Sequence, residues 1–389
     1  MREQMTHSAI DKNVPQLRFR EFEEGWNKFS LKSLTSYVDY RGRAPIKSDY
    51  GHFLVTAKNI KKGFIDYDCS KEYVAEENYS TVMSKGLPQI GDVLFTTEAP
   101  LGNVSQVDNP NIALAQRVIK FRGNHNLDNR YLLYYMLCAS FRKHISIKAN
   151  GSTVEGISGK ELHKSPIGCP TLPEQQKIAT FLSSVDAKIQ QLSKKKSLLA
   201  DYKKGVMQKI FSQELRFKDA KGNDYPDWEE KKLGEVFEIG SGRDYKHLLS
   251  GDIPVYGTGG YMTSVNDFLY DGESVCIGRK GTIDKPRFYN GKFWTVDTLF
   301  FTHSFKSSLP KFVYYTFQLI NWKKYNEASG VPSLSKKTIE KIEILLPSLK
   351  EQQKIANFLS ALDTKIEKVN TQINNTQAFK KGLLQQMFV

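Results

Sequence analysis

One long segment occurs twice in this chain. Residues 170–211 align without a gap with residues 347–388, at an offset of 177, and 19 of the 42 aligned positions are identical. Pro170 and Pro347 open the two copies, and each follows a strand-like run. A repeat of this length constrains the fold more than any other feature, because both copies must form the same structural unit. We therefore expect two related halves.

Apolar residues recur in steps of three and four through both copies, which is typical of a helix with a coiled-coil seam. At 1.5 Å per residue each helix would be about 55–60 Å long. Neither apolar stripe can stay in water, so we expect the two helices to pair. Each stripe has one polar interruption: Lys196 aligns with Ile373, and Thr376 aligns with Leu199. The expected seam consists of Ile178, Leu182, Val185, Ile189, Leu192 and Leu199, continuing through Tyr202, Val206 and Ile210, and of Ile355, Leu359, Leu362, Ile366, Val369 and Ile373, continuing through Phe379, Leu383 and Met387.

The segments before the helices form two globular pieces, which have diverged far more than the helices. The run LRFR at 17–20 is echoed by LRFK at 215–218, and Trp26 by Trp228. Their residue patterns predict strands at 92–95, 115–121, 274–277 and 298–301, and amphipathic helices at 129–145 and 311–325. The expected division is therefore 1–168, 169–212, 213–345 and 346–389.

The chain is strongly basic, with 56 lysines and arginines against 42 acidic residues and a net charge of +14. Such a charge favours a polyanionic partner, most often nucleic acid. A merely basic soluble protein explains the charge equally well. The run of lysines at 194–196 could contact phosphate or a partner, but a solvated helix face is the simpler explanation.

The cysteines and the apolar segments narrow the class of protein further. Cys69, Cys138, Cys169 and Cys276 form no CxxC pair and have no histidine cluster beside them, which argues against a zinc site and a disulfide framework. The first residues, MREQMTHSAI, lack the apolar core of a signal peptide. No apolar run approaches the roughly 18–20 residues that span a bilayer. We expect a cytoplasmic protein with reduced thiols and no metal site.

The repeated helices open with LPEQQKIA at 172–179 and LKEQQKIA at 349–356. This signature, present twice between diverged globular pieces, resembles the specificity subunit of type I restriction–modification enzymes, and the resemblance covers the whole chain. It implies an α+β fold with two mixed α/β target recognition domains, 1–168 and 213–345. The helices of 169–212 and 346–389 would form an antiparallel coiled coil that relates the domains by a pseudo-twofold axis.

The same resemblance implies a non-catalytic function. Each recognition domain would bind one half of a bipartite double-stranded DNA site, and the helices would set the spacing and dock two methylase subunits. Restriction subunits would join through the methylase. No cofactor is expected in this chain: S-adenosylmethionine would belong to the adenine methylase, and ATP and magnesium to the nuclease.

Base edges are read by Arg, Lys, Asn, Gln and acidic side chains, and phosphates are bound by Lys, Arg and backbone amides. Loops rich in these residues lie at matching places in the two globular pieces. An exposed turn explains any single one of them about as well as DNA contact, so the loops are better candidates as groups. The candidate DNA-binding residues are Arg41, Arg43, Lys47, Lys58, Asn59, Arg243, Tyr245, Lys246, Thr258, Arg279 and Lys280.

Two other classes of protein compete with this interpretation. A nuclease could use Asp227 with Asp244 and Lys246, a loose PD…DxK motif, since metal-dependent cleavage needs converging carboxylates and a lysine. A methylase could use the DNPN run at 108–111 or the glycines at 240–242. Both patterns are more simply turns. A purely structural coiled-coil protein would not need two large globular pieces or the positive charge.

Overall fold

The computed structural model describes residues 13–40, 44–151 and 155–389. The chain divides into two compact units. Unit 1 contains residues 1–193 and 371–389, and unit 2 contains residues 194–370. The two long helices, α6 (Leu172–Phe211) and α10 (Leu349–Gln386), lie where the repeat predicts them, and each contributes one part to each unit. The helices are therefore shared between the units.

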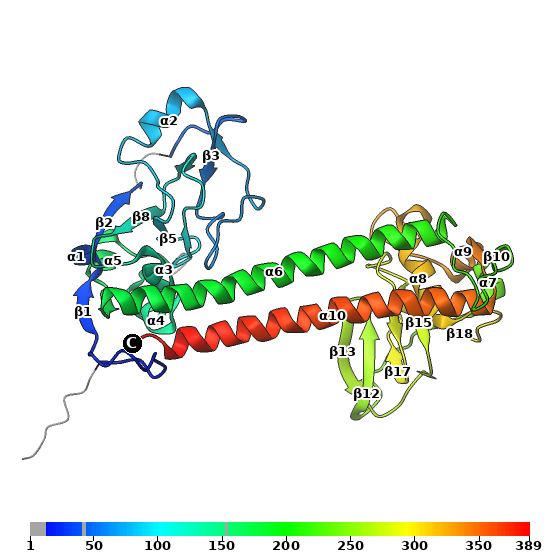
Figure 1. The fold of residues 1–389 in the computed structure, drawn as a ribbon. Coiled ribbons are helices and arrows are strands. Elements are labelled where there is room, and N and C mark those ends of the chain that lie inside the picture. Colours follow the sequence, from blue (N-terminus) through cyan, green and yellow to red (C-terminus); the bar gives the residue numbers. More distant parts are fainter. Residues whose placement is uncertain (1–12, 41–43, 152–154) are drawn as a thin grey trace, which may run out of the picture. The chain divides into compact units, whose positions relative to one another are not determined.

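The described residues of unit 1 form three small sheets and five short helices beside its parts of α6 and α10 (Figure 1). One sheet has the order β2-β8-β5-β6, a second β4-β3-β7, and β1 pairs with β9. The pair of β3 and β7 is parallel, and the others are antiparallel. The strands are β1 (Asn27–Ser30), β2 (Thr35–Asp39), β3 (His52–Val55), β4 (Tyr73–Val74), β5 (Val93–Thr96), β6 (Val104–Gln106), β7 (Ile112–Leu114), β8 (Val118–Gly123) and β9 (Pro166–Cys169). The helices are α1 (Leu31–Leu34), α2 (Glu76–Val82), α3 (Asn129–Leu137), α4 (Ala139–Lys148) and α5 (Gly159–Lys164).

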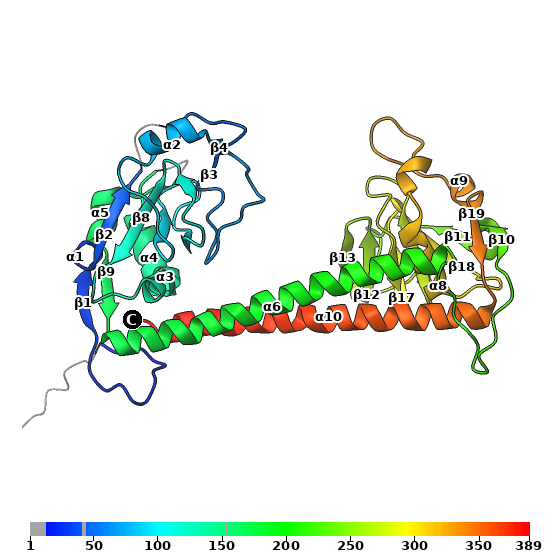
Figure 2. The same ribbon diagram turned by 45° about the horizontal axis from the view of Figure 1, so that its top comes forward.

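Unit 2 has a similar topology, with a further strand, β14, in its second sheet. Its sheets have the orders β11-β18-β15-β16 and β13-β12-β17-β14, with β12 parallel to β17, and β10 pairs with β19, which leads into α10 (Figure 2). The strands are β10 (Glu229–Lys232), β11 (Glu238–Ser241), β12 (Ser250–Gly257), β13 (Gly260–Val265), β14 (Tyr270–Asp271), β15 (Ser274–Gly278), β16 (Arg287–Tyr289), β17 (Lys292–Thr295), β18 (Leu299–His303) and β19 (Glu343–Leu346). The helices are α7 (Leu233–Val236), α8 (Pro310–Leu319), the 3-10 helix η1 (Trp322–Tyr325) and α9 (Lys336–Glu340).

The sequence predictions for the globular pieces need three corrections. Residues 115–121 are not one strand, because a turn at 116–117 separates β7 from β8. Residues 129–145 form two helices, because Cys138 adopts an extended conformation (ψ 159°) and its side chain caps α4. Residues 311–325 likewise divide into α8 and η1, with extended backbone at Ile320.

The first turn of each long helix is held by a buried glutamate. Glu174 accepts hydrogen bonds from the Arg18 guanidinium (2.7 and 2.8 Å) and from the indole N–H of Trp26 (3.3 Å). The hydrogen bond from Arg18 raises the pKa of that guanidinium. In unit 2, Glu351 accepts from Arg216 (2.9 Å) and from the indole of Trp228 (3.1 Å) in the same way. The weak similarity between LRFR with Trp26 and LRFK with Trp228 therefore reflects a buried ion pair that occurs in both units.

The next residue of the repeat, a glutamine, ties each helix to its own unit. Gln175 accepts the backbone N–H of Asp128 (3.0 Å) and donates to the carbonyl of Asn126 (2.9 Å). Gln352 accepts the N–H of Leu309 (2.8 Å) and donates to Ser307 (3.0 Å). The EQ of the repeated motif is conserved between the copies because both side chains are buried and satisfied in this one geometry.

Within each unit the two helices share a core. In unit 1, Leu182 and Val185 of α6 belong to one apolar cluster with Leu383 and Met387 of α10, and in unit 2, Ile210 of α6 belongs to one cluster with residues of α10. Of the twelve expected seam residues up to 199 and 373, nine are buried and the other three, Ile189, Leu199 and Ile366, are partly buried.

The expected seam is wrong at Tyr202 and Phe379, which are 54% and 55% exposed. The next residues, Lys203 and Lys380, point inward instead, because a strict alternation of four and three residues passes through them. Lys203 pairs with Asp363 (2.6 Å) in unit 2. A lysine can occupy the seam because its aliphatic stem packs against apolar neighbours while the ammonium reaches a carboxylate.

A tyrosine completes each of these ion pairs. In unit 1, Asp186 accepts Lys380 (2.5 Å) and the hydroxyl of Tyr134 (2.8 Å). In unit 2, Asp363 accepts Lys203 and the hydroxyl of Tyr315 (2.7 Å). Burial raises the pKa of both phenols, so they stay protonated as donors.

Candidate nucleic-acid interface

We call the sheet β2-β8-β5-β6 of unit 1 and the sheet β11-β18-β15-β16 of unit 2 the main sheets. In unit 1, the loops after β5, before β8 and before α5 meet at one end of the main sheet. The N–H of Thr97 donates to the carbonyl of Arg117 (2.9 Å), and the carbonyl of Thr97 accepts the N–H of Ile157 (3.0 Å). Thr97 is therefore the central residue that fixes the other two loops. These hydrogen bonds use backbone groups, so they leave the neighbouring side chains able to vary.

The same connections recur in unit 2. The N–H of Arg279 donates to the carbonyl of Thr298 (2.8 Å), and the carbonyl of Arg279 accepts the N–H of Leu334 (2.9 Å). Arg279 thus occupies the place of Thr97, Lys280 that of Glu98, and Asp297 that of Gln116. The two units present different side chains on one backbone frame.

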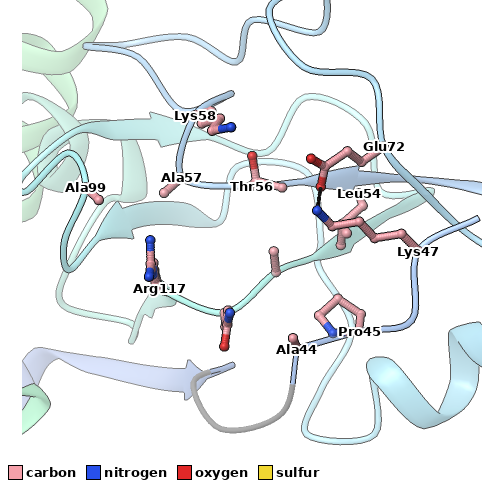
Figure 3. A pocket seen from close by; sticks show the side chains of 12 residues that line it. Ala44, Pro45, Lys47, Leu54, Thr56, Ala57, Lys58, Glu72, Ala99 and Arg117 are labelled. Carbon is pink, nitrogen blue, oxygen red and sulfur yellow. Dashed lines mark ion pairs between the residues drawn. The ribbon is translucent and has the colours of Figure 1, made fainter.

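A cavity of about 220 Å³ opens at this end of unit 1 (Figure 3). Arg117 lies on one side of it, where its Nε contacts Glu98 (2.8 Å). Lys47 lies on the other side and pairs with Glu72 (3.0 Å), away from Arg117 in Figure 3. The lining residues are Ala44, Pro45, Lys47, Leu54, Thr56, Ala57, Lys58, Glu72, Ala99, Ala115, Gln116 and Arg117.

The corresponding surface of unit 2 is also basic. Arg279, Lys280 and Lys336 line a cavity of about 390 Å³ together with Ser241 and Glu327. Hydrogen bonds from the hydroxyls of Thr338 and Ser335 lower the pKa of Glu327, so its carboxylate stays charged. Three cations against one carboxylate make this surface attractive to phosphate.

The structure brings several of the predicted candidates together. Lys47 and Lys58 share the cavity of unit 1, and Arg279 and Lys280 share that of unit 2. The remaining candidates of unit 2 lie in two neighbouring loops: Arg243 and Lys246 are exposed, Thr258 is partly exposed in the turn between β12 and β13, and Tyr245 packs against the core. Arg41 and Arg43 lie outside the described residues.

Asn59 needs a correction, because it is completely buried. Its side-chain oxygen accepts the N–H and the hydroxyl of Thr56 (3.0 and 2.8 Å), and its amide donates to the carbonyls of Asp66 (2.9 Å) and Ser70 (2.8 Å). The amide is thus fully used in shaping its own loop. We assign Asn59 a structural function in place of DNA contact.

Sequence reasoning missed four residues of these surfaces: Gln116, Arg117, Asp297 and Lys336. The first two were hidden in a predicted strand, and Asp297 directly precedes another predicted strand, outside the loops that were compared. Gln116 and Arg117 come immediately before β8, as Asp297 and Thr298 come immediately before β18. An alignment of these two strands would have indicated all four residues.

The nuclease interpretation gains no support from the geometry. The carboxylate of Asp227 is fully exposed and its ion-pair partner is Arg216 (3.6 Å). Over the described ranges, no group of three or more His, Cys, Asp or Glu side chains could hold a metal ion. No helix among these residues is both long and apolar enough to cross a membrane.

Comparison with known proteins identifies the class of protein that this fold and these surfaces define. A family model described as the type I restriction modification DNA specificity domain matches residues 23–200 and again residues 225–376. The chain therefore belongs to the family of type I restriction–modification specificity subunits. The two matches fall on the two halves of the repeat.

Individual relatives extend this result over the full length. A putative type I restriction enzyme MjaX specificity subunit from Methanocaldococcus jannaschii is 25% identical over 96% of this chain and 95% of its own. The MjaVIII specificity subunit of the same organism is 34% identical, over 32% of this chain and 30% of its own. The crystal structure of the S subunit of a type I restriction–modification system from M. genitalium has the same fold, with a TM-score of 0.66 and 18% identity over 97% of this chain and 99% of that one.

Proposed function

We propose that this chain is the DNA-reading subunit of a type I restriction–modification complex and has no catalytic activity of its own. Each unit reads one half of a bipartite DNA site through the loops at the end of its main sheet. The observation that carries the proposal is the repeated backbone frame around Thr97 and Arg279, on which the two units display different side chains. A common frame with variable side chains is what two readers of different sequences require.

The helices would form an antiparallel coiled coil that sets the distance between the half-sites. Three polar pairs support this: Asp186 with Lys380 in unit 1, and Lys196 with Asn370 and Lys203 with Asp363 in unit 2. In each pair the two residue numbers add up to 566, so both units have the same antiparallel register. Exchange of the two repeat copies, at an offset of 177, converts the first pair into the third.

A pseudo-twofold relation between two readers suits DNA, whose backbone has the same symmetry, because equivalent domains can then face equivalent grooves. Two methylase subunits would bind the helices, and restriction subunits would join through them. S-adenosylmethionine would be bound by the methylase, and ATP and magnesium by the nuclease. The chain itself would contribute binding and geometry.

The test is a domain exchange read out by methylome sequencing. The chain is expressed in a host with its methylase, and residues 213–345 are replaced by the corresponding segment of another family member. We expect one half of the bipartite methylated motif to change and the other half to persist. An unchanged motif, or methylation or cleavage of DNA by the purified chain alone, would contradict the proposal.

A further inference from the structure

The cavity of unit 1 contains a polar side chain that the fold does not use. Gln116 lines it, and among the described residues no group of the protein hydrogen-bonds to its amide. The floor beside it is apolar, formed by Leu54, Ala57 and Ala115. At about 220 Å³ the cavity is smaller than the roughly 300–1,000 Å³ of a small-molecule site, so it suits the edge of a larger ligand.

Arg117 is held beside this amide by one side-chain contact and by two hydrogen bonds to its backbone carbonyl. Its Nε contacts Glu98 at 2.8 Å, and its carbonyl accepts both the N–H and the hydroxyl of Thr97 (2.9 and 3.3 Å). The side chain is nevertheless 48% exposed, so a ligand can reach the guanidinium. An arginine fixed in this way loses less conformational freedom on binding than a free one.

Arg117 has a strained backbone conformation that the shared frame does not require. Its φ of +74° lies in the left-handed region, which non-glycine residues rarely adopt. Thr298, which occupies the same place in unit 2 and accepts the same hydrogen bond, keeps a negative φ. The shared frame therefore does not require the left-handed conformation. Strain of this kind clusters at binding sites, where it positions a functional side chain.

We propose that Gln116 and Arg117 are the base-reading residues of unit 1. The inference rests on the proposed function, since it names the specificity-determining residues of one reader. Glutamine pairs with the N6 and N7 of adenine, and arginine with the O6 and N7 of guanine. The half-site read by unit 1 thus contains purines contacted by this loop.

The matching position in unit 2 predicts a different preference. Asp297 is exposed, and it has no ion pair with any residue of the described chain. A bare carboxylate repels phosphate, so it is unfavourable on a basic DNA-binding surface unless it accepts a hydrogen bond from a base. Cytosine N4 is the donor that a carboxylate reads. Asp297 therefore serves as the matched control position for the other half-site.

The experiment compares Gln116→Ala and Arg117→Gly with Asp297→Asn, each expressed with the methylase and assayed by methylome sequencing. Glycine at position 117 accepts a φ of +74° without strain, so this variant removes the guanidinium and keeps the fold. We expect discrimination at one or two base pairs of a single half-site to fall about 5- to 150-fold. Asp297→Asn should relax only the other half-site.

A second control separates reading from general affinity. Lys58→Ala, in the same cavity, should weaken binding to all sequences and lower the slope of log affinity against log salt by about one, with the motif unchanged. An assembled complex of Gln116→Ala or Arg117→Gly that methylates the original motif with full discrimination would overturn the inference, as would loss of assembly in Arg117→Gly. Neither result would affect the domain exchange, whose failure would instead reject the proposed function.

Discussion

Lengthening both long helices by the same amount should lengthen the spacer of the DNA site. Insertion of seven residues between Ser193 and Lys194 and of seven between Asn370 and Thr371 restores the 3.5-residue seam on both sides of each insertion. At 1.5 Å per residue each helix grows by about 10.5 Å, the length of about three base pairs. The insertion points are equivalent in the repeat, so the polar pairs of each unit keep their partners.

The assay is methylome sequencing of a host that carries the lengthened chain and its methylase. We expect both half-sites to be unchanged and the spacer to grow by one to three base pairs. The range reflects the roughly 100° by which three base pairs turn the second half-site around the DNA axis, a rotation that the complex must absorb.

Insertion of the seven residues into α6 alone is the matched control. It shifts one helix against the other, so Lys203–Asp363 and Asp186–Lys380 cannot both form. We expect this variant to lose assembly or stability. If the doubly lengthened chain methylates sites with the original spacer, the helices do not set the spacing and the reasoning is refuted.

Three further predictions concern the buried polar groups. Asp186→Ala leaves Lys380 without its carboxylate and should cost about 1–3 kcal/mol of unfolding free energy in urea titrations, because the pair is only partly buried; a cost within 0.3 kcal/mol would contradict its place in the seam. Glu351→Ala should lower the free energy of unfolding by about 3 kcal/mol, because it leaves the Arg216 guanidinium without its carboxylate partner. Glu351→Gln should lower it by less, because the amide oxygen can still accept a hydrogen bond. The pKa of Asp92 is lowered in the folded protein, so its ion pairs contribute their full stability above the unfolded pKa of about 3.9. This stability is lost as the pH falls through the folded pKa. Asp92→Asn should therefore make Tm depend less on pH on the acid side, which thermal unfolding at several pH values would measure.

The lowered pKa of Asp92 has an identifiable cause. Burial opposes ionisation of this carboxyl, but hydrogen bonds from Arg122 (2.7 and 2.8 Å) and the charge of Lys120 (3.2 Å) outweigh it and lower its pKa. This group is structural, and it belongs to the interior of unit 1 rather than to the surface that would face DNA.

The long helices could be predicted from the sequence because their signal is local and periodic. Leu182 and Leu359 follow from spacing alone, and both are completely buried. The same reasoning failed at Tyr202, because an apolar residue beside the expected position was preferred to Lys203. The lysine is in the seam because Asp363 and Tyr315, distant in the sequence, provide its partner and its packing.

The candidate interface could be predicted only as a set of loops. Lys58 and Asn59 are adjacent and equally suited to DNA by composition, yet one is exposed and the other is completely buried. Asn59 is buried because its amide donates hydrogen bonds to the carbonyls of Asp66 and Ser70. No local sequence pattern predicts these hydrogen bonds. Arg117 was missed for the opposite reason, because its neighbours read as one continuous strand.

The contrast between the repeated and the diverged parts has a physical basis. Glu174 and Glu351 are each buried with an arginine and a tryptophan, so changing any one member leaves a charge or an N–H without a partner. The loops proposed to read DNA are held by backbone hydrogen bonds, as at Thr97 and Arg279, which do not depend on the side chain. Substitutions at Gln116 or Asp297 should therefore change the sequence that is read at little cost in stability. A fold that concentrates its sequence constraints in the helices can thus change its DNA target without changing its assembly.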